Sequence, residues 1–227
     1  KALLRNADLA HTFHAKADLF GISGDVHFDF GVAWDRSREV AAGHVKGIHY
    51  LMKKNKITEY DGRGSFVDDH TIEVKTSEGG TETVTFDNAI IATGSTVRLL
   101  PGVSLSENVV TYEEQILTRE LPKSIVIVGA GAIGMEFAYF FNAFGSKVTV
   151  VEMLDRILPV EDAEVSEFMT KALTKQGIKI LTKSGLEKLE PGANGVTAAI
   201  KGADGKVTST EFSHAIVAIG IVPNTEN

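Results

Sequence analysis

Residues 124–136 read SIVIVGAGAIGME, an apolar, β-branched run that breaks into the pattern Gly-x-Gly-x-x-Gly. Each glycine has a physical role where a strand turns into a helix. Gly129 allows the tight turn, Gly131 leaves the backbone open to a close ligand, and Gly134 lets the helix pack on the sheet. The free N–H groups at the helix start favour an anion. The stretch therefore predicts a site for the pyrophosphate of a dinucleotide.

The residues that follow the glycines fit the same unit. We predict a helix over about 133–144 and a second strand at 147–151 that ends in Glu152. Glu152 lies 18 residues after Gly134, close to the about 20 expected for the acid that holds the adenosine ribose hydroxyls. A carboxylate there repels a 2′-phosphate, which favours NAD, although Arg156 nearby leaves NADP as an alternative. The other alternative is a βαβ unit with an accidental glycine turn.

The composition excludes several classes of protein. The chain has 227 residues, of which 43% are hydrophobic, so a sizeable core is available. A net charge of −7 argues against nucleic acid as a partner. No apolar run reaches the about 18 residues of a membrane span, and the start lacks the apolar core of a signal peptide. We therefore expect a cytoplasmic protein. Because the chain begins with Lys1 and not Met, we also expect it to be processed or truncated.

A second pattern occurs twice. Residues 86–94 (FDNAIIATG) and 212–220 (FSHAIVAIG) share the form Phe-x-x-Ala-Ile-[Ile/Val]-Ala-x-Gly. Each follows short alternating strands with glycine turns, and each is typical of a β-meander that leads into a buried central strand. Strand ends of this kind form the crevice in which α/β sheets bind ligands. The repeat therefore predicts two dinucleotide-binding domains.

We predict an α/β fold with two Rossmann-like domains, each of three β/β/α layers. The glycine pattern lies 91 residues before Gly220, whereas no such pattern precedes Gly94, so the first domain is expected to be incomplete at its N-terminus. The expected bounds are 1–99 for the first domain, 100–121 for a linker and 122–227 for the second domain. Further elements are expected as helices near the start, at 35–55 and at 161–176, and as strands near 71–75, 84–86, 89–92 and 178–181.

Together these motifs resemble the flavin-dependent pyridine nucleotide–disulfide oxidoreductases, and within them the dihydrolipoamide dehydrogenase branch. The resemblance covers nearly the whole chain. It also rests on residues 1–4 (KALL), 52–57 (MKKNKI), 110–114 (VTYEE) and 218–224 (AIGIVPN). It implies FAD as the cofactor of the first domain and NAD as the cofactor of the second.

The resemblance also implies roles for single residues. It implies that Lys1 approaches the flavin and pairs with Glu136. Without the resemblance, Lys1 is interpreted as a solvated terminal residue and Glu136 as an ordinary acid in the first turn of a helix. The residues implied for FAD are Lys1, Gly64, Thr93, Gly94 and Ser95. The residues implied for NAD are Gly129, Ala130, Gly131, Ala132, Ile133, Gly134, Met135, Glu136, Glu152, Ser184 and Gly220. The seven histidines form no metal-binding pattern with Asp, Glu or Cys, so no metal site is expected.

The activity implied by the resemblance is oxidation of dihydrolipoamide through a cysteine pair and FAD, with hydride passed to NAD. The implied partners are dihydrolipoamide on the acyltransferase subunits of 2-oxoacid dehydrogenase complexes, and a second copy in a homodimer. This chain has no cysteine and lacks the family's C-terminal dimerisation domain, so we expect it to be inactive by itself. The alternatives are a non-catalytic NAD-binding module and a related NADH oxidase or disulfide reductase.

Overall fold

The computed structural model describes residues 1–192 and 195–226. Contacts between residues divide the chain into two compact units. The first unit comprises Lys1–Arg38 and Ser95–Asn224, and the second comprises Glu39–Gly94 with the last described residues. The boundaries between these units differ from the bounds predicted at residues 99 and 121. Those bounds refer to cofactor-binding domains, and they stay a prediction.

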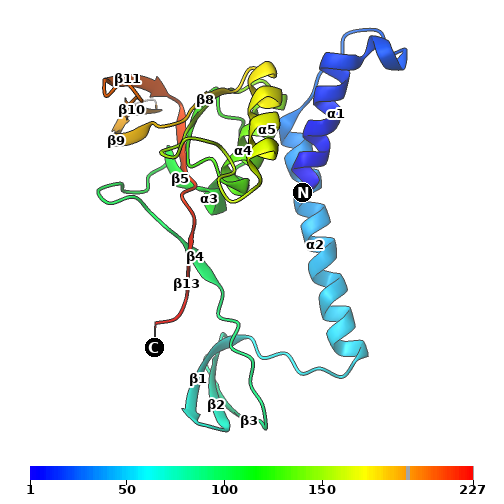
Figure 1. Cartoon of the computed structure of the whole chain (residues 1–227). Coiled ribbons are helices and arrows are strands. Elements are labelled where there is room, and N and C mark those ends of the chain that lie inside the picture. The colour runs from blue at the N-terminus through cyan, green and yellow to red at the C-terminus, as the bar shows by residue number, and fades with distance from the viewer. Residues whose placement is uncertain (193–194, 227) are drawn as a thin grey trace. The chain divides into compact units, whose positions relative to one another are not determined.

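The first unit is built on a parallel sheet of five strands (Figure 1). In spatial order the strands are β5 (Val109–Thr111), β12 (His214–Val217), β6 (Ser124–Val128), β7 (Lys147–Val151) and β8 (Lys179–Leu181). Strands β6 and β7 are rich in β-branched residues, as expected for a parallel sheet that is covered on both faces. Ile125, Val126 and Ile127 are fully buried.

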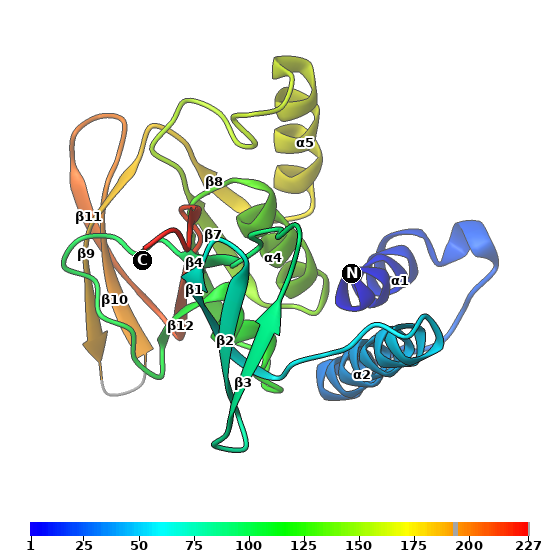
Figure 2. The same ribbon diagram turned by 90° about the horizontal axis from the view of Figure 1, so that it is seen from below.

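Helices cover one face of this sheet and an antiparallel meander covers the other (Figure 2). The helices on the sheet are α4 (Ala132–Ala143) and α5 (Ala163–Lys175), and α1 (Ala2–Lys16) with the first part of α2 (Phe30–Lys54) packs on the outer side of α4. The meander consists of β9 (Gly185–Gly192), β10 (Gly195–Lys201) and β11 (Val207–Phe212). The predicted three-layer α/β fold is therefore confirmed for this unit.

The N-terminal helices pack on α4 through aromatic rings. Phe30 stacks on Phe140 with ring centroids 6.4 Å apart, and Leu3 and Ala7 of α1 join the same core. Helix α2 begins at Phe30, five residues before the predicted start. The reason is a local cap, because Asp29 Oδ1 accepts the backbone N–H of Val32 at 3.0 Å. The predicted helix up to residue 20 instead ends at Lys16 and is followed by the 3₁₀ turn η1 (Asp18–Phe20).

The start of α2 is held to the loop before β6 by an ion pair. Arg119 donates to both carboxylate oxygens of Asp35, at 3.0 Å from Nε and 2.9 Å from Nη2. The hydrogen bond from Arg119 lowers the pKa of Asp35 from its ordinary value. A Cβ on Gly31 would lie 2.8 Å from the guanidinium, so a larger residue there would displace the Arg119 side chain from this position. Trp34 Nε1 donates to the carbonyl of Ile116 at 3.0 Å.

The segment predicted as a linker, 100–121, contains two elements of the first unit. These are β5 and α3 (Tyr112–Ile116). Thr111 is the N-cap residue of α3 and forms a capping box. Its side-chain oxygen accepts a backbone N–H of the first turn, and the Glu114 carboxylate accepts the backbone N–H of Thr111. A two-stranded antiparallel ribbon of β4 (Ser95–Val97) and β13 (Ile221–Pro223) completes the unit. None of the helices among the described residues is both long and apolar enough to cross a bilayer.

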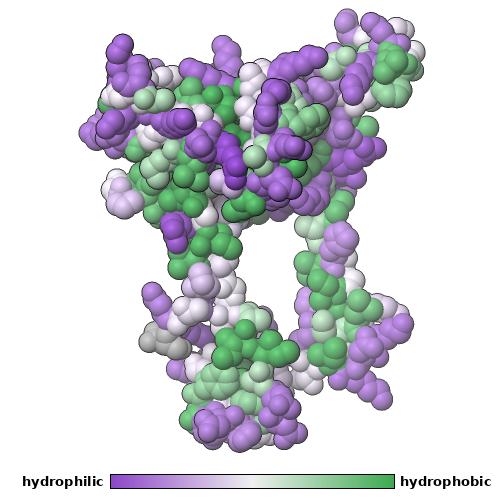
Figure 3. Space-filling model, in the orientation of Figure 1, coloured by the Kyte–Doolittle hydropathy of each residue, from purple (hydrophilic) through white to green (hydrophobic). Residues whose placement is uncertain are grey.

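The second unit contains an antiparallel sheet and the part of α2 from Glu39 onward. Its strands are β1 (Gly62–Asp68), β2 (Thr71–Thr76) and β3 (Thr81–Thr85). The predicted strand at 89–92 is wrong, since these residues form no strand and Ile90 is 95% exposed. Its repeat partner β12 is a strand because β5 and β6 flank it, whereas 89–92 has no neighbouring strand in the described chain. Apolar side chains are correspondingly exposed on this unit (Figure 3).

Candidate dinucleotide-binding site

The glycine turn after β6 is fixed by close backbone contacts. Gly129 has φ +106°, a left-handed conformation that favours glycine. A Cβ at Gly129 would lie 2.4 Å from the carbonyl oxygen of Ala218, at the end of β12. The N–H of Gly129 donates to the carbonyl of Val151 at 2.9 Å. The turn is therefore tied to both neighbouring strands of the sheet.

The other two glycines differ in what surrounds them. A Cβ at Gly134 would lie 2.0 Å from the carbonyl oxygen of Gly129, so helix α4 approaches the turn as closely as backbones allow. A Cβ at Gly131 would meet no atom within 4 Å. Gly134 therefore serves packing, whereas Gly131 borders open space in which a ligand can reach the backbone.

The N-terminus of α4 borders that space. Gly131 is the N-cap and makes no side-chain cap. The first N–H groups of a helix have no partner within it, and the helix dipole favours negative charge at this end. Ala132 is exposed and Ile133 is half-buried. This terminus therefore has the donors and the field that a pyrophosphate requires.

Glu152 connects the glycine turn to the loop after β7. Its side-chain Oε2 accepts the N–H of Ala130 at 2.7 Å, and Oε1 accepts the N–H of Leu154 at 2.9 Å. The residue is only 9% exposed. Each carboxylate oxygen has a second lone pair, so the group retains acceptor capacity for a hydroxyl. Glu152 thus holds the turn and still offers an anionic acceptor beside it.

The remaining residues predicted for NAD lie on both sides of this turn. Met135 is buried in the helix-side core, 4% exposed. Ser184 is 4% exposed, and its hydroxyl donates to the carbonyl of Thr182 at 3.0 Å. Gly220 has φ +118° and no atom within 4 Å of a built Cβ. Gly220 therefore borders open space, whereas the side chains of Met135 and Ser184 are directed into protein contacts.

Lys1 and Glu136 form an ion pair between Lys1 Nζ and Glu136 Oε1. The two residues are 135 positions apart in sequence and are brought together because α1 packs on α4. Their side chains are 81% and 45% exposed, so the pair lies at the surface of the first unit. The structure thus brings together the two residues predicted as a flavin-side pair.

The residues predicted for FAD occupy both units. Gly64 lies in β1 and is exposed, as are Thr93 and Gly94. Gly94 has φ +77°, which favours glycine at that position. Ser95 is the first residue of β4 and pairs with Pro223 in the ribbon.

Sequence reasoning missed two supports of the glycine turn. Leu158 has φ +48°, and its N–H donates to the carbonyl of Ala130 at 2.8 Å. The hydroxyl of Ser166, which is 1% exposed, donates to the carbonyl of Leu158 at 3.1 Å. A left-handed leucine has no sequence signal, but Ser166 stands among apolar residues on the inner face of α5, and that position marks a buried hydroxyl.

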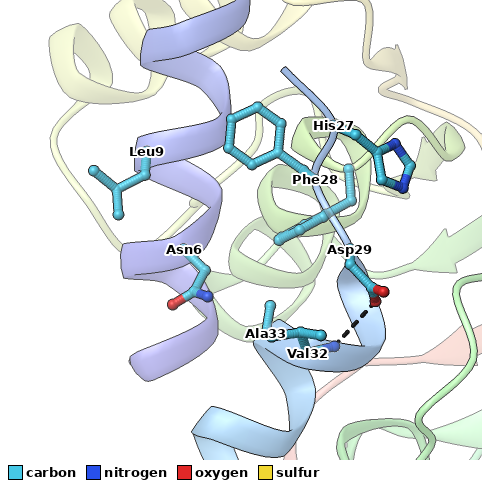
Figure 4. A pocket seen from close by; sticks show the side chains of 8 residues that line it. Asn6, Leu9, His27, Phe28, Asp29, Val32 and Ala33 are labelled. Carbon is cyan, nitrogen blue, oxygen red and sulfur yellow. Dashed lines mark hydrogen bonds between the residues drawn. The ribbon is translucent and has the colours of Figure 1, made fainter. Parts of the chain in front are cut away.

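A separate hollow of about 370 Å³ lies between α1 and the start of α2 (Figure 4). Its walls include Asn6 and Leu9 of α1, Val32 of α2, and Phe28 and Phe144. Its lining contains none of the residues predicted for a cofactor. Within residues 1–192 and 195–226, no group of three His, Cys, Asp or Glu side chains is placed to hold a metal ion.

Comparisons with known proteins agree with this geometry. The sequence pattern of the pyridine nucleotide-disulphide oxidoreductase family matches residues 1–227. The dihydrolipoyl dehydrogenase of Mycobacterium tuberculosis is 57% identical over 226 residues, which cover 100% of this chain and 48% of that protein. The dihydrolipoyl dehydrogenase of Mycobacterium leprae is 55% identical, with 100% and 49% covered. The chain therefore spans about half the length of these curated relatives.

Two solved structures show the same fold. LpdA from Mycobacterium tuberculosis superposes with a TM-score of 0.88 at 25% identity, covering 99% of this chain and 49% of that one. The HOCl-induced flavoprotein disulfide reductase RclA from Escherichia coli gives a TM-score of 0.80 at 26% identity, with 100% and 47% covered. The resemblance read from the sequence is confirmed, and the chain belongs to the pyridine nucleotide-disulphide oxidoreductase family.

Proposed function

We propose that this chain is the part of a dihydrolipoyl dehydrogenase that binds NAD and accepts hydride from the flavin. The observation that carries the proposal is the open backbone at Gly131 beside the carboxylate of Glu152. The identity of 57% to a dihydrolipoyl dehydrogenase over the whole chain supports this choice within the family.

The residues at the turn fit a dinucleotide. The pyrophosphate binds against Gly131 and the first N–H groups of α4, where a methyl group would occupy its space. The carboxylate of Glu152 accepts the hydroxyls of the adenosine ribose. Ile133 and Gly220 border the nicotinamide end, and Ser184 supports the adenine end through its backbone.

The flavin side of the proposal rests on Lys1 and Glu136. FAD, when bound, supplies the carrier of two electrons between a disulfide and NAD. The Lys1 ammonium stabilises negative charge near the flavin, and Glu136 orients that ammonium through the ion pair. Gly64, Thr93, Gly94 and Ser95 would contact FAD. In this proposal residues 1–99 belong to an FAD-binding domain and 122–227 to an NAD-binding domain.

The substrate and partners of the whole protein follow from the same proposal. They are dihydrolipoamide on the acyltransferase subunits of cytoplasmic 2-oxoacid dehydrogenase complexes, and a second copy in a homodimer. The chain has no cysteine, so none of its own residues can exchange a disulfide with dihydrolipoamide. We expect the 227 residues alone to bind NADH without oxidising dihydrolipoamide.

A chimaera tests the proposal directly. Residues 1–227 replace the matching half of the Mycobacterium tuberculosis relative, and dihydrolipoamide-dependent reduction of NAD is measured after the flavin spectrum has shown that FAD is bound. We expect activity within about tenfold of the relative, and loss of at least tenfold in the Glu136→Gln variant, since the orienting carboxylate is removed. A chimaera that holds FAD and binds NADH but does not reduce NAD would contradict the proposal.

A further inference from the structure

The loops after β7 and β8 run side by side at the carboxyl edge of the parallel sheet. Glu152 N donates to the carbonyl of Leu181 at 2.8 Å, and Ser184 N donates to the carbonyl of Glu152 at 2.9 Å. Lys183 N donates to the carbonyl of Leu154 at 2.8 Å. These three bonds place the backbone of Lys183 directly beside the segment that carries Glu152.

Lys183 is held in an unusual backbone conformation. Its φ of +50° is left-handed, which a non-glycine residue adopts only where its surroundings fix it. Among the described residues, three non-glycine residues have positive φ. Two of them, Leu158 and Lys183, lie in the loops after β7 and β8. Strain of this kind gathers at functional sites, and here it fixes the position from which an exposed lysine side chain begins.

The charged side chains of these loops differ in whether they are already engaged in hydrogen bonds or ion pairs. Both oxygens of Glu152 already accept backbone N–H groups. Arg156 donates from Nη2 to the carbonyl of Pro159 at 3.0 Å, which turns part of its guanidinium toward its own loop. Lys183 makes no ion pair within residues 1–192 and 195–226. Lys183 is therefore an exposed lysine whose backbone lies beside the Glu152 segment and whose ammonium is not engaged in an ion pair in the described part of the chain.

We propose that Lys183 is a specificity-determining residue of the dinucleotide site, and that its ammonium offsets part of the repulsion between Glu152 and a 2′-phosphate. This inference rests on the proposed NAD site, because it needs the adenosine ribose at Glu152. The chain then prefers NADH and still has measurable affinity for NADPH. The preference is set by two opposed charges on neighbouring loops and not by Glu152 alone.

The size of the effect follows from the exposure of the lysine. A 2′-phosphate carries about −1.5 to −2 charges at neutral pH. One exposed ion pair changes an equilibrium by roughly 1.5-fold to fivefold. Removing the charge with Lys183→Ala should raise the ratio of the NADPH and NADH dissociation constants about threefold. Reversing the charge with Lys183→Glu should raise it about tenfold, because attraction is replaced by repulsion.

The experiment titrates the full 227-residue chain with NADH and NADPH by calorimetry at low salt. The matched control is Lys179→Glu, which makes the same charge change on an exposed residue at the opposite end of β8. We expect the ratio to rise in Lys183→Glu, to stay within about twofold in Lys179→Glu, and to return toward the wild-type ratio in about 1 M salt, where the Debye length is about 3 Å.

The possible results separate the two proposals. If wild type binds NADH and Lys183→Glu leaves the ratio unchanged, or shifts it no more than Lys179→Glu does, the role of Lys183 is refuted and the NAD site stands. If wild type binds neither nucleotide, the proposed function fails, and the inference about Lys183 fails with it.

Discussion

The same substitution should have different effects at two glycines of the Gly-x-Gly-x-x-Gly pattern. Gly134→Ala places a methyl group 2.0 Å from the carbonyl oxygen of Gly129, and neither backbone can yield without moving α4 away from β6. Overpacking of a buried site costs typically about 1–3 kcal/mol. We expect about 3 kcal/mol for Gly134→Ala, because the contact is with backbone. In a chain of this size that lowers the melting temperature by roughly 6–12 °C.

Gly131→Ala should leave stability nearly unchanged. Gly131 has φ −72°, which alanine also adopts, and the added methyl group meets no atom within 4 Å. Alanine is a poorer N-cap than glycine by about 0.5–1 kcal/mol, and the smaller entropy of the unfolded chain returns about 0.4–1 kcal/mol. The two effects nearly cancel. The methyl group instead fills the space assigned to pyrophosphate, so affinity for NADH should fall at least about tenfold.

The assay is urea unfolding followed by circular dichroism, combined with NADH titration of each folded variant. Gly134→Ala should lose stability, and Gly131→Ala should lose NADH affinity while its free energy of unfolding stays within about 1 kcal/mol of the wild-type value. A Gly131→Ala variant that binds NADH as wild type does, or a Gly134→Ala variant of unchanged stability, would refute these roles of the two glycines.

Three further predictions concern the framework around the site. Lys56 has φ +57° just after α2, where the N–H groups of Lys56 and Ile57 donate to the carbonyls of Lys53 and Met52 in a Schellman motif. Glycine adopts this left-handed conformation without strain, so Lys56→Gly should stabilise the chain by about 0.5–1 kcal/mol. An unchanged or lower melting temperature would contradict this prediction. Burial lowers the pKa of His214, an effect that Glu107 and Glu120 oppose, so the neutral imidazole stabilises the fold above the ordinary pKa of 6.5 and this contribution is lost as pH falls through the folded pKa. In urea unfolding between pH 7.5 and 5, the free energy of unfolding of His214→Gln should therefore fall less than that of wild type, and parallel curves for the two proteins would refute this prediction. The hydrogen bond from Arg119 lowers the pKa of Asp35, so the ionised carboxylate stabilises the fold above its ordinary pKa of 3.8. Asp35→Asn should therefore lower the urea midpoint reported by Trp34 fluorescence at pH 7, and this difference from wild type should vanish as pH falls well below 3.8. A difference that persists at low pH would count against an ionic origin.

Local signals predicted the glycine turn, α4 and α5 well. The strand–glycine–helix pattern at 124–136 and the apolar period of α5 specify their own backbone, since each element depends mainly on nearby residues. The spacing from the glycines also indicated an acid at the end of β7, and the Glu152 carboxylate contacts the glycine turn through the N–H of Ala130. The prediction failed at 89–92, where an apolar run resembles β12 but has no neighbouring strands. A parallel strand is stabilised by its neighbours, and its own sequence cannot supply them.

Other features depend on contacts that no local pattern encodes. The start of α2 is set by the Asp29 cap, a signal that was present in the sequence but hidden by the stronger apolar period farther along. The left-handed backbones of Leu158 and Lys183 are imposed by bonds to Ala130 and Leu154. Leucine and lysine do not signal such a conformation. The contact between the loops after β7 and β8 is therefore seen only in the three-dimensional structure.

The most direct test of the central claim is a crystal structure of the 227-residue chain soaked with NADH. We expect the pyrophosphate to lie against Gly131 and the N–H groups of Ala132 and Ile133, with the adenosine ribose hydroxyls on the carboxylate of Glu152. A dinucleotide bound elsewhere, for instance in the hollow lined by Asn6, Phe28 and Phe144, with the glycine turn left empty, would contradict it.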